Sequence, residues 1–269
     1  MLANFMIEAL LPVFGFLIAI VASMVGVGGG VFIVPLLTLA YDFSPPNAIG
    51  TSLATIVFTS FASTVNYSRQ RRIYYRTGLI LAVVTVPGAY LGAYLTSIVE
   101  PSLLGLAFGV FLTFVALRMI LRFRPTQESR LDLKNPSNSV DSESSLLSSR
   151  NRIVLGTLLA FFGGLSSGLL GIGGGSLMVP VMVLVMGMAM HISVATSMFT
   201  MIFTSTSGVI QHSSLGNIDV GYALLLVVGT VFGAQVVAYT SRRISGKNLR
   251  RIFGLVLILV SARMILKYI

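Results

Sequence analysis

Ten apolar stretches, separated by short polar segments, make up the hydrophobic pattern of this chain. They cover residues 5–24, 27–41, 46–67, 77–98, 102–121, 153–170, 172–190, 192–211, 218–240 and 249–268. Most have a length close to the roughly 20 residues that cross a bilayer as an α-helix, whereas 27–41 is shorter. Because only helices and closed barrels satisfy their backbone polar groups in lipid, these helix-length stretches predict an all-α polytopic membrane protein.

A polar segment, residues 122–152, interrupts this pattern in the middle of the chain. It is rich in Ser and carries charges of both signs, which is typical of a loop or a disordered linker. Five apolar stretches precede this segment and five follow it, so the linker separates two halves of similar size.

The two halves are repeats of each other. With an offset of 145 residues, the segment GVGGGVFIVP at 26–35 aligns with GIGGGSLMVP at 171–180, and Thr51-Ser52 aligns with Thr196-Ser197. Matches of this kind at one offset indicate an internal duplication. The predicted organisation is a first transmembrane repeat at 1–121, a polar cytoplasmic linker at 122–152 and a second transmembrane repeat at 153–269.

Composition supports the membrane assignment and excludes several other classes of protein. Hydrophobic residues make up 55% of the chain and charged residues 10%, whereas an ordinary soluble domain has about 25% charged residues. The net charge is +10, but the basic residues cluster between apolar stretches, which argues against nucleic-acid binding. The chain contains no Cys, which excludes thiolate chemistry, and the sequence indicates no metal and no cofactor.

The distribution of Lys and Arg predicts the orientation in the membrane. Basic residues concentrate in 68–76, in the linker 122–152 and in 241–251, whereas the N-terminus and the loops 98–102 and 212–217 have none. By the positive-inside rule the first three segments are cytoplasmic and both termini lie outside the cell membrane. Each half then crosses an odd number of times, which predicts two repeats of inverted topology in the inner (cytoplasmic) membrane.

A glycine-rich break separates the first two apolar stretches of each half, at Gly26–Gly30 and at Gly171–Gly175. Broken backbone at membrane depth is tolerated where it is buried in protein or lines a wet cavity. A helix that starts just after each break would point its free N–H groups and its positive dipole end at the break, which favours an anion. We therefore expect two hairpins whose tips converge on one anion.

Two alternatives to this interpretation stay open in the sequence. The glycines can serve close helix packing, because the pairs 26/30, 88/92, 171/175 and 229/233 all have the small-xxx-small spacing. We favour packing for 88/92 and 229/233, and a site for the triple-glycine runs. Stretches 5–24 and 153–170 are also long enough to cross fully, so each break is either re-entrant or the junction of two full crossings.

The repeated pattern G-x-G-G-G-x-x-x-x-P, followed in each half by a Thr-Ser pair, resembles the TauE/SafE sulfite exporter family. The resemblance extends over nearly the whole chain outside the linker. It implies a polytopic inner-membrane carrier that moves sulfite, sulfoacetate or related organosulfur anions, usually outward, without fixing which anion.

Polar groups in apolar surroundings complete the candidate site. Hydroxyls could donate to anion oxygens, although each could instead bond its own helix backbone. The candidate substrate-binding residues are Gly28, Gly29, Gly30, Thr51, Ser52, Gly173, Gly174, Gly175, Ser176, Thr196 and Ser197. The candidates for the pathway or a proton relay are Asn66, Gln211 and His212, with an exposed side chain at the outer boundary as the alternative for His212.

The function predicted from these features is export of sulfite, sulfoacetate, another sulfonate or thiosulfate by alternating access, with the small anion and the lipid bilayer as partners. Two alternatives are a membrane-embedded accessory or assembly protein without transport activity, and an uptake permease for a sulfonate. An enzyme is not expected, because the chain has no H-E-x-x-H motif, no G-x-S-x-G motif and no carboxylate pair within the apolar stretches. The sequence does not determine the oligomeric state.

Overall fold

The computed structural model describes residues 10–120, 150–240 and 246–269, and within these residues the chain is helical with no strand. The first half contains α2 (Leu11–Val25), α3 (Gly30–Ala40), α4 (Pro45–Arg69), α5 (Tyr75–Leu95) and α6 (Pro101–Ile120). The second half contains α8 (Arg150–Leu170), α9 (Gly175–Pro180), the π-helical turn η3 (Val181–Val185), α10 (Met190–Ser214), α11 (Val220–Thr240) and α12 (Gly246–Tyr268). The all-helical prediction is confirmed for these residues.

Each predicted apolar stretch corresponds to one helix, apart from 172–190. That stretch forms α9 and then η3, because the helix changes its hydrogen-bonding pattern directly after Pro180. Most of the predicted linker, 122–149, lies outside the described residues. Its last residues, 150–152, belong to α8.

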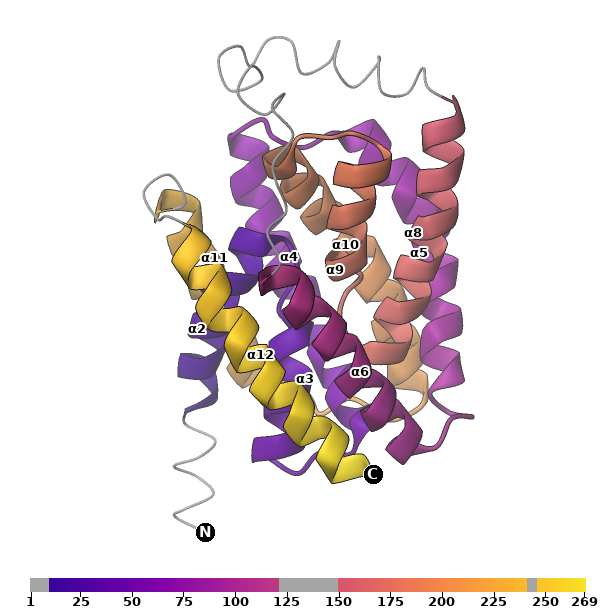
Figure 1. The fold of residues 1–269 in the computed structure, drawn as a ribbon, viewed down its shortest axis with the longest axis vertical. Helices are drawn as coiled ribbons and strands as arrows, with labels where there is room; N and C mark the ends of the chain where they lie inside the picture. Colours follow the sequence, from indigo (N-terminus) through magenta and orange to yellow (C-terminus); the bar gives the residue numbers. More distant parts are fainter. Residues whose placement is uncertain (1–9, 121–149, 241–245) are drawn as a thin grey trace.

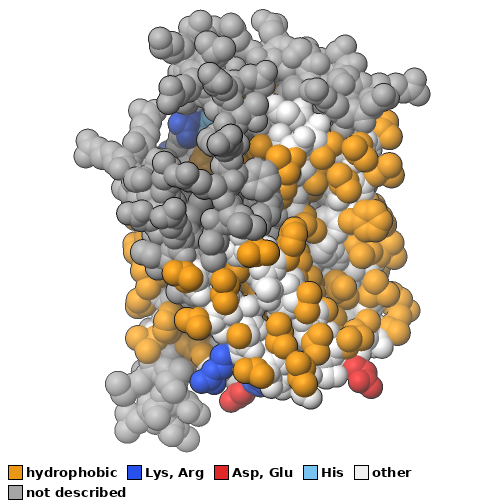
Figure 2. All heavy atoms as spheres, in the orientation of Figure 1, with side chains coloured by type: hydrophobic (Ala, Val, Ile, Leu, Met, Phe, Trp, Pro, Cys, Tyr) orange, Lys and Arg blue, Asp and Glu red, His pale blue; other side chains and the backbone are white. Residues whose placement is uncertain are grey.

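The helices have the length and surface of membrane-embedded segments. Among the residues that the structure describes, α4, α5 and α10 are long and apolar enough to cross a membrane, and other helices are apolar but shorter within the described part. Figure 2 shows apolar side chains spread over the visible face, with Asp, Glu and some Lys or Arg at its lower end and further Lys or Arg near its upper end. This arrangement fits a protein whose sides contact lipid and whose ends contact water.

Helices from opposite halves pack along each other. Helix α2 lies along α11, α8 lies along α5, and α6 lies along α12, while α4 and α10 pack against each other in the centre (Figure 1). Helix α2 corresponds to α8 at the repeat offset and α5 corresponds to α11. The contact between α2 and α11 therefore has its counterpart in the contact between α8 and α5.

Small residues allow two of these close helix contacts. A Cβ added at Gly92 of α5 would lie 2.9 Å from the carbonyl carbon of Leu165 in α8, and would overlap its oxygen. One added at Gly233 of α11 would overlap the carbonyl oxygen of Phe16 in α2. Because backbone occupies both places, the packing interpretation of the pairs 88/92 and 229/233 is confirmed.

The two central helices, α4 and α10, run in opposite directions (Figure 1). Two matching hydrogen bonds fix this arrangement. The backbone N–H of Asp219, just before α11, donates to Thr51 Oγ1 near the start of α4 at 3.0 Å. The backbone N–H of Tyr74, just before α5, donates to Thr196 Oγ1 near the start of α10 at 3.1 Å. The start of each central helix is therefore tied to a loop of the other half.

Each glycine-rich break joins a longer helix to a shorter one. Helix α2 ends at Val25 and is followed by Gly26, which has a left-handed φ of 78°, and α3 begins at Gly30. Helix α3 then leads through a short loop to the start of α4, so it runs from the break back toward one end of the molecule (Figure 1). The second break, between α8 and α9, leads in the same way through η3 to the start of α10.

Candidate functional site

The two glycine-rich breaks cross each other in the centre of the molecule. A Cβ added at Gly30 would overlap the carbonyl oxygen of Gly171 and lie 2.8 Å from the Cα of Ile172. A Cβ added at Gly175 would overlap the carbonyl oxygen of Gly26. The first glycine of each run thus contacts the last glycine of the other, and Gly30 and Gly175 need glycine because backbone of the other run occupies the place of a Cβ.

The glycines inside the two runs have a different role from those at the ends. Gly29 and Gly174 are the residues before α3 and α9, with φ of 100° and 82°, and no side chain caps either helix. A Cβ at Gly29 would meet only side-chain atoms at 3.3 Å or more, and one at Gly174 would have its nearest atom at 3.2 Å. These inner positions need glycine for their backbone conformation more than for close packing.

Six N–H groups of the two glycine runs donate to no backbone carbonyl among the described residues. In the described part of the chain, the N–H groups of Gly28, Gly29, Gly30, Gly173, Gly174 and Gly175 donate to no backbone acceptor, whereas those of Ile33 and Met178 bond back to Gly29 and Gly174. The first N–H groups of a helix lack an intrahelical partner and carry the positive end of its dipole. The crossing therefore presents two clusters of N–H donors.

The surroundings of the crossing contain no fixed charge. The sequence from Leu10 to Tyr41 and from Ile153 to Ile218 has no Asp, Glu, Lys or Arg. All eleven candidate binding residues are buried. A bound anion would be stabilised here by peptide dipoles and not by a cation, because no basic side chain is close along these helices.

The hydroxyls of the two serines in the Thr-Ser pairs donate to the breaks themselves. Ser52 Oγ donates to the carbonyl of Gly171 at 2.9 Å, and Ser197 Oγ donates to the carbonyls of Gly26 at 3.2 Å and Val194 at 2.9 Å. Thr51 and Thr196 accept the loop N–H groups described above. In this structure the four hydroxyls hold the two halves together, so their role as anion donors stays a prediction.

The pathway candidates lie at the ends of the central helices. Asn66 Nδ2 donates to Gln235 Oε1 of α11 at 3.1 Å, and Gln211 is buried. His212 is fully buried, and its Nε2 donates to the carbonyl of Gly168 in α8 at 3.0 Å. The expectation of an exposed His212 at the outer boundary is therefore wrong: α10 continues to Ser214, which turns this side chain toward α8.

Two residues that the sequence analysis did not single out belong to this arrangement. Tyr67 corresponds to His212 at the repeat offset and makes the matching bond, from its hydroxyl to the carbonyl of Ser23 at 2.7 Å. The repeat offset could therefore have identified Tyr67 from the sequence alone. Ser167 of α8 is fully buried, and its hydroxyl has no hydrogen-bond partner among the described residues. It lies beside the second glycine run, because a Cβ added at Gly174 would be 3.6 Å from the Cβ of Ser167. No sequence pattern distinguishes Ser167 from the other serines of the chain.

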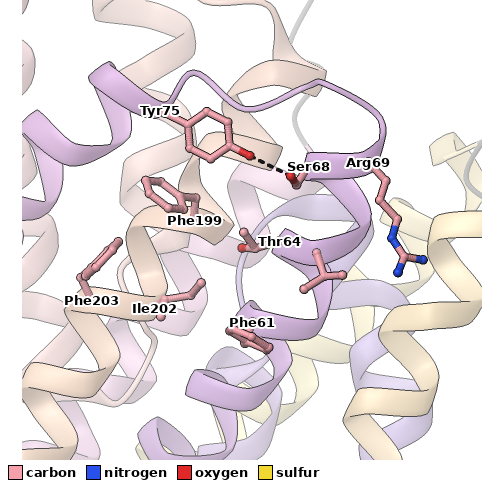
Figure 3. A pocket seen from close by; sticks show the side chains of 9 residues that line it. Phe61, Thr64, Ser68, Arg69, Tyr75, Phe199, Ile202 and Phe203 are labelled. Carbon is pink, nitrogen blue, oxygen red and sulfur yellow. Dashed lines mark hydrogen bonds between the residues drawn. The ribbon is translucent and has the colours of Figure 1, made fainter.

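A pocket of about 490 Å³ lies away from the crossing, between α4, the start of α5 and α10 (Figure 3). Its lining is mainly aromatic and aliphatic, including Phe61, Phe199 and Phe203, and the Tyr75 hydroxyl donates to Ser68 at its rim at 2.8 Å. Phe61 is largely exposed, and the pocket contains none of the predicted site residues.

Comparison with known proteins identifies one family. Residues 11–264 match the model of the family described as sulfite exporter TauE/SafE. The chain is 34% identical to the "probable membrane transporter protein YunE" of Bacillus subtilis over 95% of this chain and 96% of that protein. It is 29% identical to the "probable membrane transporter protein YdhB" of the same organism, over 82% and 85% of the two chains. No solved structure matches this chain significantly.

Proposed function

Because this chain belongs to the TauE/SafE family of membrane transporters, we propose that it exports sulfite or a related organosulfur anion across the cytoplasmic membrane by alternating access. The related anions are sulfoacetate, other sulfonates and thiosulfate. The crossing of the two glycine-rich breaks, with its N–H donors and without fixed charge, is the observation that carries this proposal. The relatives are named as transporters, which points to a role other than catalysis.

The proposal includes an inverted repeat. Three observations support the inverted repeat: the offset of 145 residues, the corresponding contacts of α2 with α11 and of α8 with α5, and the opposite directions of α4 and α10. Under this arrangement α2 with α3, and α8 with α9, are re-entrant hairpins that enter the membrane from opposite sides. Inverted repeats with broken helices at the midplane are a common architecture of secondary transporters.

The chemistry of the crossing suits a sulfur oxyanion. Such an anion has several oxygens, and the N–H groups of Gly28, Gly29 and Gly30 from one side and of Gly173, Gly174 and Gly175 from the other can each bond one of them. The hydroxyls of Ser167 and Ser176 would add donors beside the second run. Donors without a buried cation bind moderately, which lets a carrier release its substrate.

The direction of transport follows from energetics. An anion that leaves a cell with a negative interior gains about 2.3 kcal/mol per charge for each 100 mV of membrane potential. Export therefore needs no coupling ion. Uptake of a sulfonate would need one, and the long stretches without Asp or Glu offer few groups to carry a coupled proton.

The test is a flux measurement with purified protein in liposomes. Vesicles are loaded with sulfite, thiosulfate or sulfoacetate, a potential of defined sign is imposed, and efflux is compared with protein-free vesicles. We expect efflux of at least one of these anions that accelerates when the loaded side is negative. Absence of flux for all three, from protein that elutes as a single species in detergent, would instead support the accessory role.

A further inference from the structure

Two apolar side chains fill the space beside the two glycine runs. Ile56 lies near the middle of α4 and Met201 near the middle of α10, and the two residues correspond at the repeat offset. Ile56 is 0% and Met201 1% exposed. A Cβ added at Gly28 would lie 3.2 Å from Ile56 Cγ2 and 3.4 Å from Met201 Sδ, and would overlap the Met201 methyl group.

The same two side chains face the second glycine run. A Cβ added at Gly173 would lie 2.9 Å from Ile56 Cγ2 and would overlap the Met201 methyl group, and one added at Gly175 would lie 2.7 Å from Met201 Sδ. Met201 therefore touches both runs at once. An anion of four or five heavy atoms has no room at the crossing until at least one of these side chains moves.

We propose that Ile56 and Met201 form the gate of the anion site, with Met201 as the moving part. This inference rests on the proposed function. The reason for the asymmetry is the chemistry of the two side chains: Ile is branched at Cβ and held near one χ1 rotamer in a helix, whereas Met is unbranched and has three rotatable bonds. In the closed state their apolar atoms separate the N–H donors from water and exclude ions.

Two buried hydroxyls continue the path on either side of the gate. Ser60 and Ser205 follow Ile56 and Met201 by one helical turn, so they lie on the same faces of α4 and α10. Both are fully buried, and neither hydroxyl has a hydrogen-bond partner within the described residues. Because buried polar groups are rarely left unpaired, these hydroxyls are the next contacts for an anion that leaves the glycine runs.

The antiparallel course of the two helices places these serines on opposite sides of the gate. Ser60 lies toward the end of α4, and Ser205 toward the end of α10, which point to opposite ends of the molecule (Figure 1). The path thus runs from Ser60 past Ile56 and Met201 to Ser205. It has one apolar barrier in its centre and one hydroxyl on each side.

The first experiment compares Met201→Ala with Met198→Ala in the liposome assay. Met198 is equally buried in the apolar core on the same helix, but it is not among the side chains nearest to any glycine of the two runs. We expect Met201→Ala to raise sulfite efflux and passive chloride leak about tenfold, which corresponds to a barrier lower by about 1.4 kcal/mol. Met198→Ala should leave both rates close to those of the unmodified protein.

A second variant tests the gate without a large loss of volume. The chain has no native Cys, so Met201→Cys carries the only thiol. We expect the anionic sulfonatoethyl methanethiosulfonate to modify it faster than the cationic trimethylammonium analogue, to block efflux, and to be slowed by an excess of ethanesulfonate. Met198→Cys should stay unmodified. This labelling decides the question if Met201→Ala aggregates during purification.

The outcomes separate the gate from the proposed function. If the unmodified protein carries anions but Met201→Ala behaves like Met198→Ala and Met201→Cys resists labelling, the gate is disproved and the transport function stands. If the unmodified protein moves no anion in any condition, the proposed function itself is overturned. Slower efflux from Met201→Ala with unchanged protein stability would also contradict the gate, because the residue would then bind and not block.

Discussion

Matched Gly→Ala substitutions distinguish the inner glycines of the breaks from the glycines that pack helices. One double variant changes Gly29 and Gly174, and the other changes Gly92 and Gly233. Each adds two methyl groups to the protein at corresponding positions of the two repeats. The first pair lies at the proposed anion site and the second lies between α5 and α8 and between α11 and α2.

The structure gives the expected size of each effect on stability. At Gly29 and Gly174 the new Cβ meets nothing closer than 3.2 Å, so the main cost is the left-handed backbone, about 1 kcal/mol at each position. At Gly92 and Gly233 the Cβ overlaps a carbonyl oxygen of the neighbouring helix, and no rotamer change relieves it. Overpacking costs about 3 kcal/mol per site, and the better helix propensity of Ala returns about 1 kcal/mol.

The effect on transport should run in the opposite order. A methyl group beside the N–H donors of Gly29 and Gly174 would displace an anion oxygen, and loss of one hydrogen bond to a charged group weakens binding by about 1.5 kcal/mol, or about tenfold. We therefore expect the apparent KM for sulfite to rise about tenfold or more in this variant. The variant at Gly92 and Gly233 should keep its KM in whatever fraction of the protein remains folded.

The assay combines two measurements on the same preparations. Apparent melting temperatures in detergent report the loss of stability, and concentration-dependent efflux from liposomes, at matched amounts of folded protein, reports the KM. The reasoning is refuted if the Gly29 and Gly174 variant loses only stability and keeps the KM of the unmodified protein. The glycine runs would then be packing motifs, and the anion site would lie elsewhere.

Three further predictions concern the membrane topology, the linker and the Thr-Ser pairs. A thiol at Ser139→Cys should resist an impermeant maleimide in intact cells and react after lysis, since the linker is predicted to be cytoplasmic; labelling of intact cells contradicts this orientation. Deletion within 128–148 should leave efflux largely unchanged in liposomes, because trimming a loop changes its closure entropy little, whereas lost efflux from well-inserted protein would assign the linker a regulatory role. Ser52→Ala and Ser197→Ala should each lower the free energy of unfolding by about 1 kcal/mol, because a buried carbonyl loses its donor; unchanged melting temperatures with a raised KM would show instead that these hydroxyls bind the anion.

The sequence by itself determined the elements of this protein and their correspondence. The helices appear where the apolar stretches lie, because hydrophobic length and glycine or proline breaks are local properties that a bilayer converts directly into helices. The offset of 145 residues also identified pairs that the structure uses in the same way in both halves, such as Thr51 with Thr196 and Ser52 with Ser197.

Only the tertiary structure decided which partner each of these groups takes. The Ser52 hydroxyl bonds the carbonyl of Gly171, which is 119 residues away in the chain, and His212 is buried against Gly168 where the sequence allowed an exposed side chain. The sequence likewise does not show which of the 12 Met residues contacts both glycine runs, and the structure identifies Met201. The physical reason is that lipid is as apolar as a helix interface, so hydropathy does not tell a lipid-facing side chain from one that closes the site.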